Sequence, residues 1–389
     1  MTAHSFDIER TPPFLAFRVL REIARKSVGE AKVLDLSQGE PGYGFSPNVR
    51  SRRFYAFLMM LDIEFNDHLY RKTLFAYRKP EEIDEIDKKI RDTAYNLYNK
   101  ELAQELLDDF EDFIQKLMEV FRNQKLNYSR FDLLYEIFKY SNLAGGRYPE
   151  PLGQILLQAT TAEEYTETIG HKVWHDELIS VLGASHGVGT IFKGLGNEGL
   201  NFLHAGDYVL MTSPVYAPYN MLFQQRGINV LSLSIDPETG EFDTSQVEDL
   251  KRFITRIKCI ILIDPNNPTG FGGDDKFLQT IVEIAEVHNS LIVTDEVYYR
   301  FFENKKSIIS IPEARKRTVR IDSISKIERS TGLRSGHIYI SKEANKFITE
   351  KIVHSYLGDY DDFFTYMRFA KSPSGKNIGL FQHITGIPG

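Results

Sequence analysis

Short apolar runs alternate with longer amphipathic segments from about residue 129 onward. Apolar runs of about four to eight residues between polar or glycine positions are typical of buried strands, and the longer segments have helical periodicity. Strands that alternate with helices favour an α/β fold, a largely parallel sheet with helices on both faces. The predicted strands are ISVLG (179–183), DYVLMT (207–212), INVLSLS (228–234), KCIILI (258–263), SLIVTDE (290–296), RTVRIDS (317–323) and HIYIS (337–341).

A helical pattern precedes this alternation, from about residue 46 to residue 128. Its apolar residues recur at spacings of three and four and form a stripe on one helix face: Leu102, Leu106, Phe110, Phe113, Leu117 and Phe121. We interpret this stripe as the core of an inserted helical layer, with a dimer or partner surface as the alternative. The charged run PEEIDEIDKKIRD (80–92) predicts a solvated helix face with internal ion pairs.

These patterns divide the chain into three parts. Residues 1–45 are an N-terminal arm that includes the amphipathic stretch PPFLAFRVLREIARK (12–26). Residues 46–128 are the helical insertion, and residues 129–389 are the α/β domain.

The composition indicates a globular chain with a large core. Hydrophobic residues make up 42% and charged residues 26% of the 389 residues, and the net charge of −7 argues against a nucleic-acid partner. The single cysteine, Cys259, lies in an apolar strand and permits no disulfide framework. We see no stretch long enough for a membrane span and no signal-peptide pattern, so we expect a cytoplasmic protein with no membrane partner.

A lysine lies between a serine and an arginine in IDSISKIERSTGLRSG (321–336), at the end of a predicted strand. Lys326 follows Ser323 by three residues and precedes Arg334 by eight. A lysine can condense with an aldehyde, while a hydroxyl and a guanidinium supply the hydrogen bond and the charged fork that bind a phosphate. Pyridoxal 5'-phosphate carries both groups and is held in proteins as a lysine Schiff base, so the run favours a site for this cofactor.

Two other strand ends carry residues that suit the ring of the same cofactor. Asp295 ends an apolar strand, and an anion beside the pyridine nitrogen keeps that nitrogen protonated. Asn267, in the turn after ILID, and Tyr298, three residues after Asp295, are suitable donors to the ring's phenolate oxygen. Ligands of open α/β sheets lie beyond the carboxyl ends of the strands, where all three residues fall.

The motifs NNPTG, DEVY and SxxK followed by GLRSG resemble those of the fold-type I, class I/II aminotransferases, and the likeness runs from about residue 33 to residue 341. VLGASHGVG resembles the family's phosphate loop, in which the backbone amides of Ala184 and Ser185 open a helix toward the phosphate. In SPVYAPY, Tyr216 takes the position of the aromatic residue that stacks on the pyridine ring.

Two motifs nearer the N-terminus are also similar to this family. YSNLAGG resembles the segment in which a tyrosine, here Tyr140, reaches the phosphate of the neighbouring subunit, which implies a homodimer. LSQGEPG, with Gly39, resembles the stretch that lines the substrate pocket.

The resemblance implies an aminotransferase that moves an amino group from an amino acid to a 2-oxo acid. It assigns Lys326 as the Schiff-base lysine and the general base at the substrate α-carbon. Asp295 would keep the ring nitrogen protonated. Asn267 and Tyr298 would contact the phenolate oxygen. The phosphate would be held by Ser185, Ser323, Arg334 and the helix amides after Ala184.

A closer likeness is to the aspartate aminotransferase and aspartate 4-decarboxylase group. The segments RYPEPLGQIL and GLNFLHAGDYVLMTSPVYAPY resemble that group, as does the helical insertion, so aspartate is a candidate substrate. Its decarboxylases carry an arginine at the position of Gln38. The missing charge favours an aminotransferase and leaves a decarboxylase-like lyase as the alternative.

Sixty-three residues (389 − 326) follow Lys326. Members of the family continue further, through a long helix into a small domain that supplies an arginine for the substrate's α-carboxylate. The resemblance therefore predicts a truncated small domain, with Arg368 as the basic residue we propose as a substitute. A third hypothesis is a relative that binds the cofactor but turns over slowly.

A competing explanation comes from GASHG, which fits the G-x-S-x-G turn of serine hydrolases. Ser185 would then act with Asp295 and with His337 or His354. That alternative leaves NNPTG, DEVY and the lysine motif unexplained.

Two histidines, His171 and His175, lie four residues apart, as metal ligands on a helix can. No third ligand falls at a useful spacing nearby, so we predict no metal site. Trp174 is interpreted as a core residue.

Overall fold

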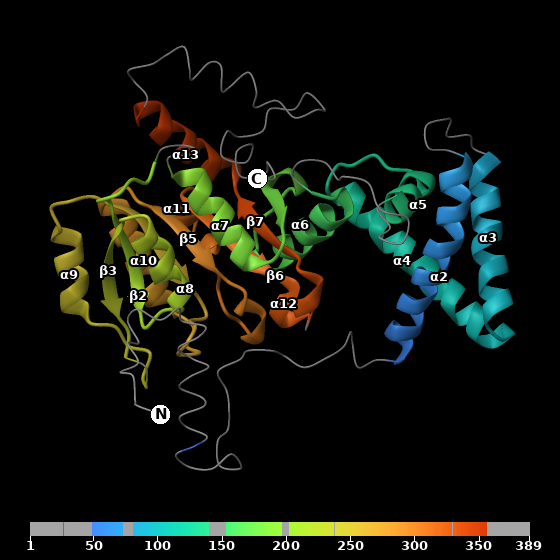
Figure 1. Cartoon of the computed structure of the whole chain (residues 1–389), viewed down its shortest axis with the longest axis horizontal. Helices are drawn as coiled ribbons and strands as arrows, with labels where there is room; N and C mark the ends of the chain where they lie inside the picture. Colours follow the sequence, from blue (N-terminus) through green and yellow to red (C-terminus); the bar gives the residue numbers. More distant parts are fainter. Residues whose placement is uncertain are drawn as a thin grey trace, which may run out of the picture.

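The computed structural model describes residues 26, 49–72, 81–139, 153–196, 202–236, 238–328 and 330–355. In these ranges a layer of helices lies beside a sheet that has helices on both faces (Figure 1). No helix within them combines the length and the apolar character needed to cross a membrane.

Among the described residues, seven strands form one sheet in the order β1-β7-β6-β5-β4-β2-β3. The pairs from β3 across to β6 are parallel, whereas β7 is antiparallel to both of its neighbours, β6 and β1. The predicted largely parallel sheet is confirmed. Its strands are β1 (Leu178–Val181), β2 (Tyr208–Ser213), β3 (Asn229–Ser234), β4 (Ile257–Ile263), β5 (Leu291–Asp295), β6 (Thr318–Ser323) and β7 (Gly336–Ile340).

The central strands are buried along their whole length because helices cover both faces of the sheet. All five residues of β5 and all six residues of β6 are buried, and Lys258 is the one residue of β4 that is not. Continuous burial accounts for near-continuous apolar runs such as KCIILI. It also means that a charged side chain in β5 or β6 must find its partners inside the protein.

Two hydrophobic clusters cover the opposite faces of the sheet. One contains Phe192 of α7, Phe223 of α8 and Ile348 of α13, and the other contains residues of α6, α9, α10 and α11. The longer helices are α6 (Ile155–Ile169), α7 (Ala184–Leu195), α8 (Ala217–Gln225), α9 (Thr244–Arg252), α10 (Asp275–Val287) and α13 (Lys342–Ser355). The short ones are η3 (His175–Glu177), η4 (Tyr299–Phe301), η5 (Ile308–Ser310), α11 (Pro312–Arg315), α12 (Ile324–Ile327) and η6 (Thr331–Leu333).

In the part of the chain that the structure describes, the layer at the other end of the molecule consists of four helices (Figure 1): α2 (Val49–Lys72), α3 (Glu81–Leu97), α4 (Lys100–Asn123) and α5 (Arg130–Lys139). The apolar stripe predicted on α4 packs into their shared core, where Leu106, Phe110, Leu117 and Phe121 are buried. The core interpretation of the stripe is therefore confirmed. Ala159 of α6 packs against the same helix, which joins this layer to the α/β part.

Domain boundaries near residues 45 and 128 stay predictions, as does a truncated small domain, because residues 1–25, 27–48 and 356–389 lie outside the described ranges.

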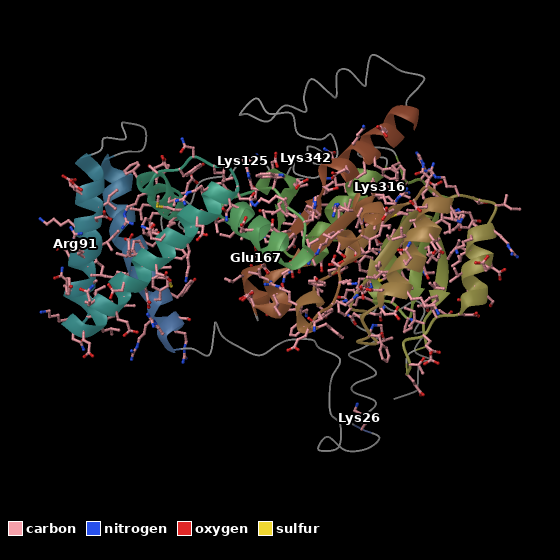
Figure 2. The ribbon with its side chains drawn as sticks, turned by 180° about the vertical axis from the view of Figure 1, so that it is seen from behind. Lys26, Arg91, Lys125, Glu167, Lys316 and Lys342 are labelled. Carbon is pink, nitrogen blue, oxygen red and sulfur yellow. The ribbon has the colours of Figure 1, made fainter. Side chains whose placement is uncertain are left out.

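The interpretation of Trp174 as a core residue is wrong. The side chain is only half-buried, and three lysine ammonium groups lie over its ring, Lys125 at 4.8 Å, Lys172 at 5.3 Å and Lys342 at 5.7 Å from the ring centroid. Figure 2 shows Lys125, beyond the end of α4, close to Lys342 at the start of α13. A tryptophan face attracts cations, so this residue connects surface segments instead of filling the core.

Candidate functional site

The predicted site residues that the structure describes lie at one edge of the sheet. β2, β4, β5 and β6 are parallel and end at this edge. β7 runs the opposite way and begins there, and β1, antiparallel to β7, ends there. The edge therefore gathers Ala184 and Ser185 after β1, Tyr216 after β2, Asn267 after β4, Asp295 and Tyr298 from β5 and its loop, Ser323 and Lys326 from β6 and α12, and Arg334 before β7.

A close approach of three backbone segments forms a cradle beside the N-terminus of α7. Gly183, the N-cap of this helix, has a φ of 88°, and a Cβ added to it would lie 2.7 Å from Nη2 of Arg334. A Cβ on Gly336 would lie 2.7 Å from the carbonyl oxygen of Asp322 and 3.0 Å from Cα of Gly183. Because neither glycine has a side chain, the end of β6, the start of β7 and the start of α7 can approach one another closely here.

The groups around this cradle suit an anion. The first amides of the twelve-residue α7, at Ala184 and Ser185, have no earlier helical turn to bond, and no side chain caps the helix at Gly183. The Arg334 guanidinium lies beside them, with Nη1 donating to the Thr331 carbonyl at 2.9 Å. These groups fit the phosphate of pyridoxal phosphate.

Ser323 lies at the end of β6, where its hydroxyl starts α12. Its Oγ accepts a hydrogen bond from the Ser325 amide at 3.3 Å, and its own amide donates to Oδ1 of Asp322 at 2.7 Å. The serine is buried, as its position in β6 requires. Lys326 is half-buried in the single turn that Ser323 caps, so the serine fixes the backbone that carries the lysine.

Asp295 is a buried carboxylate at the end of β5. The Tyr219 hydroxyl donates to its Oδ2 at 2.8 Å, and the Val297 amide donates to its Oδ1 at 3.3 Å. Burial raises the pKa of Asp295 to about 6, against the lowering effects of the two hydrogen bonds and of the nearby Lys326 charge. A carboxylate held in this way fits a positively charged ring nitrogen, which would further favour its ionised form.

Three further predicted residues border the same space. Lys326 Nζ lies 5.9 Å from the centroid of the Tyr298 ring. Tyr216, the N-cap residue of α8, is 42% exposed, and its ring centroid lies 6.5 Å from that of Tyr219. Asn267 is half-buried in the turn after β4. The exposed Tyr216 ring is suited to cover a planar ligand, and the Tyr298 phenol, near Lys326, is suited to contact it.

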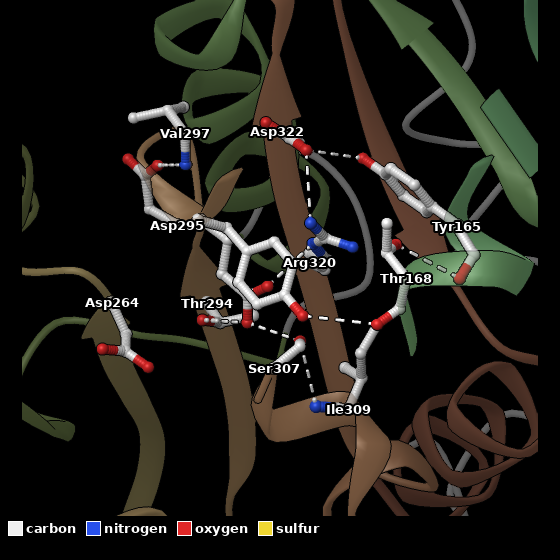
Figure 3. Close-up of polar contacts among 12 residues, drawn as sticks. Tyr165, Thr168, Asp264, Thr294, Asp295, Val297, Ser307, Ile309, Arg320 and Asp322 are labelled. Atoms are coloured by element: carbon white, nitrogen blue, oxygen red, sulfur yellow. Dashed lines mark hydrogen bonds and ion pairs between the residues drawn. The ribbon is translucent and has the colours of Figure 1, made fainter. Parts of the chain in front are cut away.

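Behind the site lies a buried charge network that the sequence patterns did not predict (Figure 3). Arg320 in β6 is 1% exposed and forms ion pairs with Glu296, at 2.9 Å, and with Asp322, at 3.2 Å. The guanidinium carbon lies 4.2 Å from the Tyr165 ring centroid, and the Tyr165 hydroxyl donates to Asp322. Since Asp322 also accepts from the Ser323 amide, this network supports the turn that carries Lys326.

A sequence signal for this network existed in RTVRIDS. An arginine in the middle of a strand predicted to be buried requires a buried anion, and the glutamate of DEVY lies at the end of the neighbouring strand. Tyr219 gave no comparable signal, because a tyrosine one helical turn after Tyr216 is equally consistent with ordinary core packing.

Some predicted residues lie outside the described ranges. These are Gly39, Tyr140, Gln38 and Arg368. Their assigned roles stay predictions.

The hydrolase alternative does not fit the geometry of its serine. Ser185 lies in the first turn of α7, and the positive φ at this turn belongs to Gly183. His337 is buried with Nε2 3.3 Å from Oγ1 of Thr161, and burial lowers its pKa to about 4. Among the described residues no hydrogen bond joins Ser185, Asp295 and His337 to one another. The His354 side chain lies outside them.

The ranges that the structure describes also contain no candidate metal site. No group of three or more His, Cys, Asp or Glu side chains there is placed to hold a metal ion.

Comparison with protein families decides the assignment. The model of the aminotransferase class I and II family matches residues 144–373, which is more than half of the chain. This chain belongs to the class I and II aminotransferases. The family resemblance of the sequence motifs is thereby confirmed, and the sheet with its two helical layers is the fold-type I large domain.

Individual relatives of this chain within the family have modest identity. An aspartate aminotransferase from Geobacillus stearothermophilus is 31% identical over 185 residues, 46% of this chain and 44% of the relative. Another from Thermotoga maritima is 26% identical over 213 residues, 54% of each. The chain therefore spans about half the length of the curated relatives it matches. Among solved structures, alanine aminotransferase from Pyrococcus furiosus covers 62% of this chain and is covered over 57% of its own, with a TM-score of 0.45 and 23% identity.

Proposed function

We propose that this chain is a pyridoxal-phosphate-dependent aminotransferase in which Lys326 binds the cofactor covalently. One observation carries the proposal: a buried carboxylate, a lysine and an anion cradle occupy the ends of neighbouring strands at one edge of the sheet. These groups match the ring nitrogen, the aldehyde and the phosphate of one molecule, and the family of the chain supports the same reaction.

Within this proposal the residues have distinct tasks. When bound, pyridoxal phosphate supplies an aldehyde that condenses with amines and a ring that accepts the electron pair left by α-proton removal. Asp295 holds a proton on the ring nitrogen, and Asn267 and Tyr298 donate to the phenolate oxygen. Tyr216 covers the ring face. Lys326 Nζ takes the proton from the substrate α-carbon and returns it.

The cradle beside α7 binds the phosphate in this proposal. The Ala184 and Ser185 amides, the Ser185 and Ser323 hydroxyls and the Arg334 guanidinium supply neutral and charged donors. Such contacts hold the cofactor during the interval in which Lys326 is free to act as a base.

The substrates that we propose are an amino acid and a 2-oxo acid, with aspartate as the candidate amino acid. Two observations support aspartate. The sequence motifs resemble those of the aspartate aminotransferase group, and curated relatives are named aspartate aminotransferases. We further propose a cytoplasmic homodimer, in which Tyr140 of one subunit would reach the phosphate bound by the other and Gly39 would line the substrate pocket.

Borohydride reduction of the cofactor-loaded protein, followed by peptide mapping, tests the proposal. The expected result is one modified peptide, the one that contains Lys326. Modification of another lysine, or of none, would overturn the proposed function. Labelling of Ser185 by a serine-hydrolase probe would favour the hydrolase instead.

Two substitutions at the cradle are expected to weaken cofactor binding. Arg334→Gln removes a charged donor, and Gly183→Ala inserts a Cβ 2.7 Å from Nη2 of the same arginine at a φ that disfavours alanine. A charge-assisted hydrogen bond contributes about 1.5–3 kcal/mol, so each variant should raise the dissociation constant by about 10- to 100-fold. Fluorescence titration of the cofactor-free protein with pyridoxal phosphate measures this dissociation constant.

Gly189→Ala is the matched control for the glycine substitution. Gly189 lies in the same helix, and an added Cβ would meet nothing within 4 Å. This variant is expected to bind the cofactor as the parent does. Equal weakening by Gly183→Ala and Gly189→Ala would contradict the cradle assignment.

A further inference from the structure

Tyr219 of α8 makes the shortest hydrogen bond that Asp295 accepts. The tyrosine is 2% exposed, and its hydroxyl lies 2.8 Å from Oδ2 of the carboxylate, compared with 3.3 Å between the Val297 amide and Oδ1. The two donors lie on either side of Asp295 along the chain. Tyr219 is in a helix 76 residues before it, and Val297 is in the loop two residues after it.

The hydroxyl of Tyr219 is not required for packing. The ring belongs to the apolar cluster that includes Met211, Phe192 and Phe223, where a phenylalanine would fill nearly the same volume. A buried hydroxyl costs free energy unless it is hydrogen-bonded, and its hydrogen-bond partner here is the carboxylate. The position therefore combines a core ring with one donor aimed at Asp295.

The same helix serves both sides of the ring site. Its N-cap residue, Tyr216, is exposed at the site, while Tyr219, one turn later, points at the buried carboxylate. The helix thereby couples the position of the aromatic cover to the position of the anion.

We propose that Tyr219 is a positioning residue that fixes the Asp295 carboxylate against the ring nitrogen of the cofactor. The inference rests on the proposed function, because it presumes the ring nitrogen as the partner of Asp295. Tyr219 itself touches neither cofactor nor substrate in this proposal and acts through the carboxylate.

The charged groups that face Asp295 influence the pKa of its carboxyl group in different directions. Asp322 in β6 disfavours the ionised carboxylate, whereas Lys326 in α12 favours it, and the Tyr298 phenol lies on the loop after β5. The hydrogen bond from Tyr219 lowers the pKa of Asp295 against the larger effect of burial. Loss of the hydroxyl should therefore raise that pKa and leave less of the carboxylate ionised at neutral pH.

Tyr219→Phe tests the inference in the full chain. Carbon-13 NMR of the cofactor-free protein should show the Asp295 pKa higher by about one unit, the size expected of a hydrogen bond to a charged group. In the loaded protein the acidic limb of the kcat/KM profile should move to higher pH in the same direction. Cofactor affinity should change little, because the phosphate cradle is intact.

Two comparisons keep this test decisive. Tyr339→Phe removes another buried tyrosine hydroxyl, one in the hydrophobic cluster on the other face of the sheet, and should leave the Asp295 titration in place. Site-specific 3,5-difluorotyrosine at position 219, a stronger donor, should lower the Asp295 pKa, and it provides the readout if Tyr219→Phe does not fold. An Asp295 titration that neither change at position 219 moves would overturn the inference. Failure of the parent to be modified at Lys326 would instead overturn the proposed function, and the NMR result would separate the two.

Discussion

Lys326→Ala is expected to abolish the covalent attachment of pyridoxal phosphate and to lower transamination by about 10²- to 10⁴-fold, the usual contribution of a positioned general base. The lysine is the one amine that the single turn α12, capped by Ser323, presents at the site edge. The phosphate cradle and Asp295 remain in the variant, so it should still bind the cofactor without a covalent bond. Absorbance spectra and single-turnover rates measure the two effects.

Lys316→Ala is the control for this variant. Lys316 follows α11, and its side chain is 46% exposed (Figure 2). Its removal should change neither the spectrum nor the rate. A Lys326→Ala protein that retains the absorbance band of the covalently bound cofactor would show that another lysine holds it.

Asp295→Asn is expected to have opposite effects on catalysis and on the stability of the cofactor-free protein. Turnover should fall by at least about 100-fold, because an unprotonated ring nitrogen is a poor electron sink. The cofactor-free variant should nevertheless be more stable than the parent near neutral pH. The reason is that the parent must keep a carboxylate ionised in a buried place.

The sign of the stability effect follows from the raised pKa of Asp295, about 6 in the folded chain against an ordinary value of 3.8. Below about pH 4 the carboxyl is protonated in both states, and its contribution to stability is fully present. As the pH rises toward 6 the unfolded chain loses this proton first, so the contribution is lost. Asparagine stays neutral throughout, and above pH 6 the variant should gain about 2–3 kcal/mol in free energy of unfolding.

Urea denaturation of the cofactor-free proteins at pH 4 and at pH 7 measures this difference. The two proteins should have similar stability at pH 4 and diverge at pH 7. Saturation with pyridoxal phosphate should then stabilise the parent more than the variant, since only the parent has an anion for the ring nitrogen. A variant that is less stable than the parent at pH 7 without cofactor would contradict the assigned environment of Asp295.

Much of this arrangement was predictable from the sequence because strand order and site chemistry leave local signatures. Parallel strands buried on both faces are apolar runs, and because such strands end at one edge of the sheet, the sequence predicts that Asp295, Ser323 and Lys326 lie together there. The anion cradle beside α7 was predicted only from the resemblance of VLGASHGVG to the phosphate loop of the family. Its geometry depends on the positive φ of Gly183 and the close approach of Gly336, which no spacing reveals.

The residues that the sequence patterns missed are those whose partners are distant along the chain. Arg320 pairs with Glu296 across two strands, and Tyr219 reaches a carboxylate 76 residues away. Trp174 was misassigned for a related reason. Aromatic residues are usually buried, and only the tertiary structure brings the lysines of three separate segments over this ring.

The strand order has a kinetic consequence for the cradle. β1 is the first strand of the sheet along the chain, yet its sheet partner is the last, β7, more than 150 residues later. Contacts of such sequence separation require the closure of a long loop and form late in folding. The helix end at Gly183 meets Arg334 only once this long loop has closed. A phosphate bound there would bridge β1 and β7 and slow the opening of this end of the sheet. Bound cofactor would therefore increase the kinetic stability of the fold.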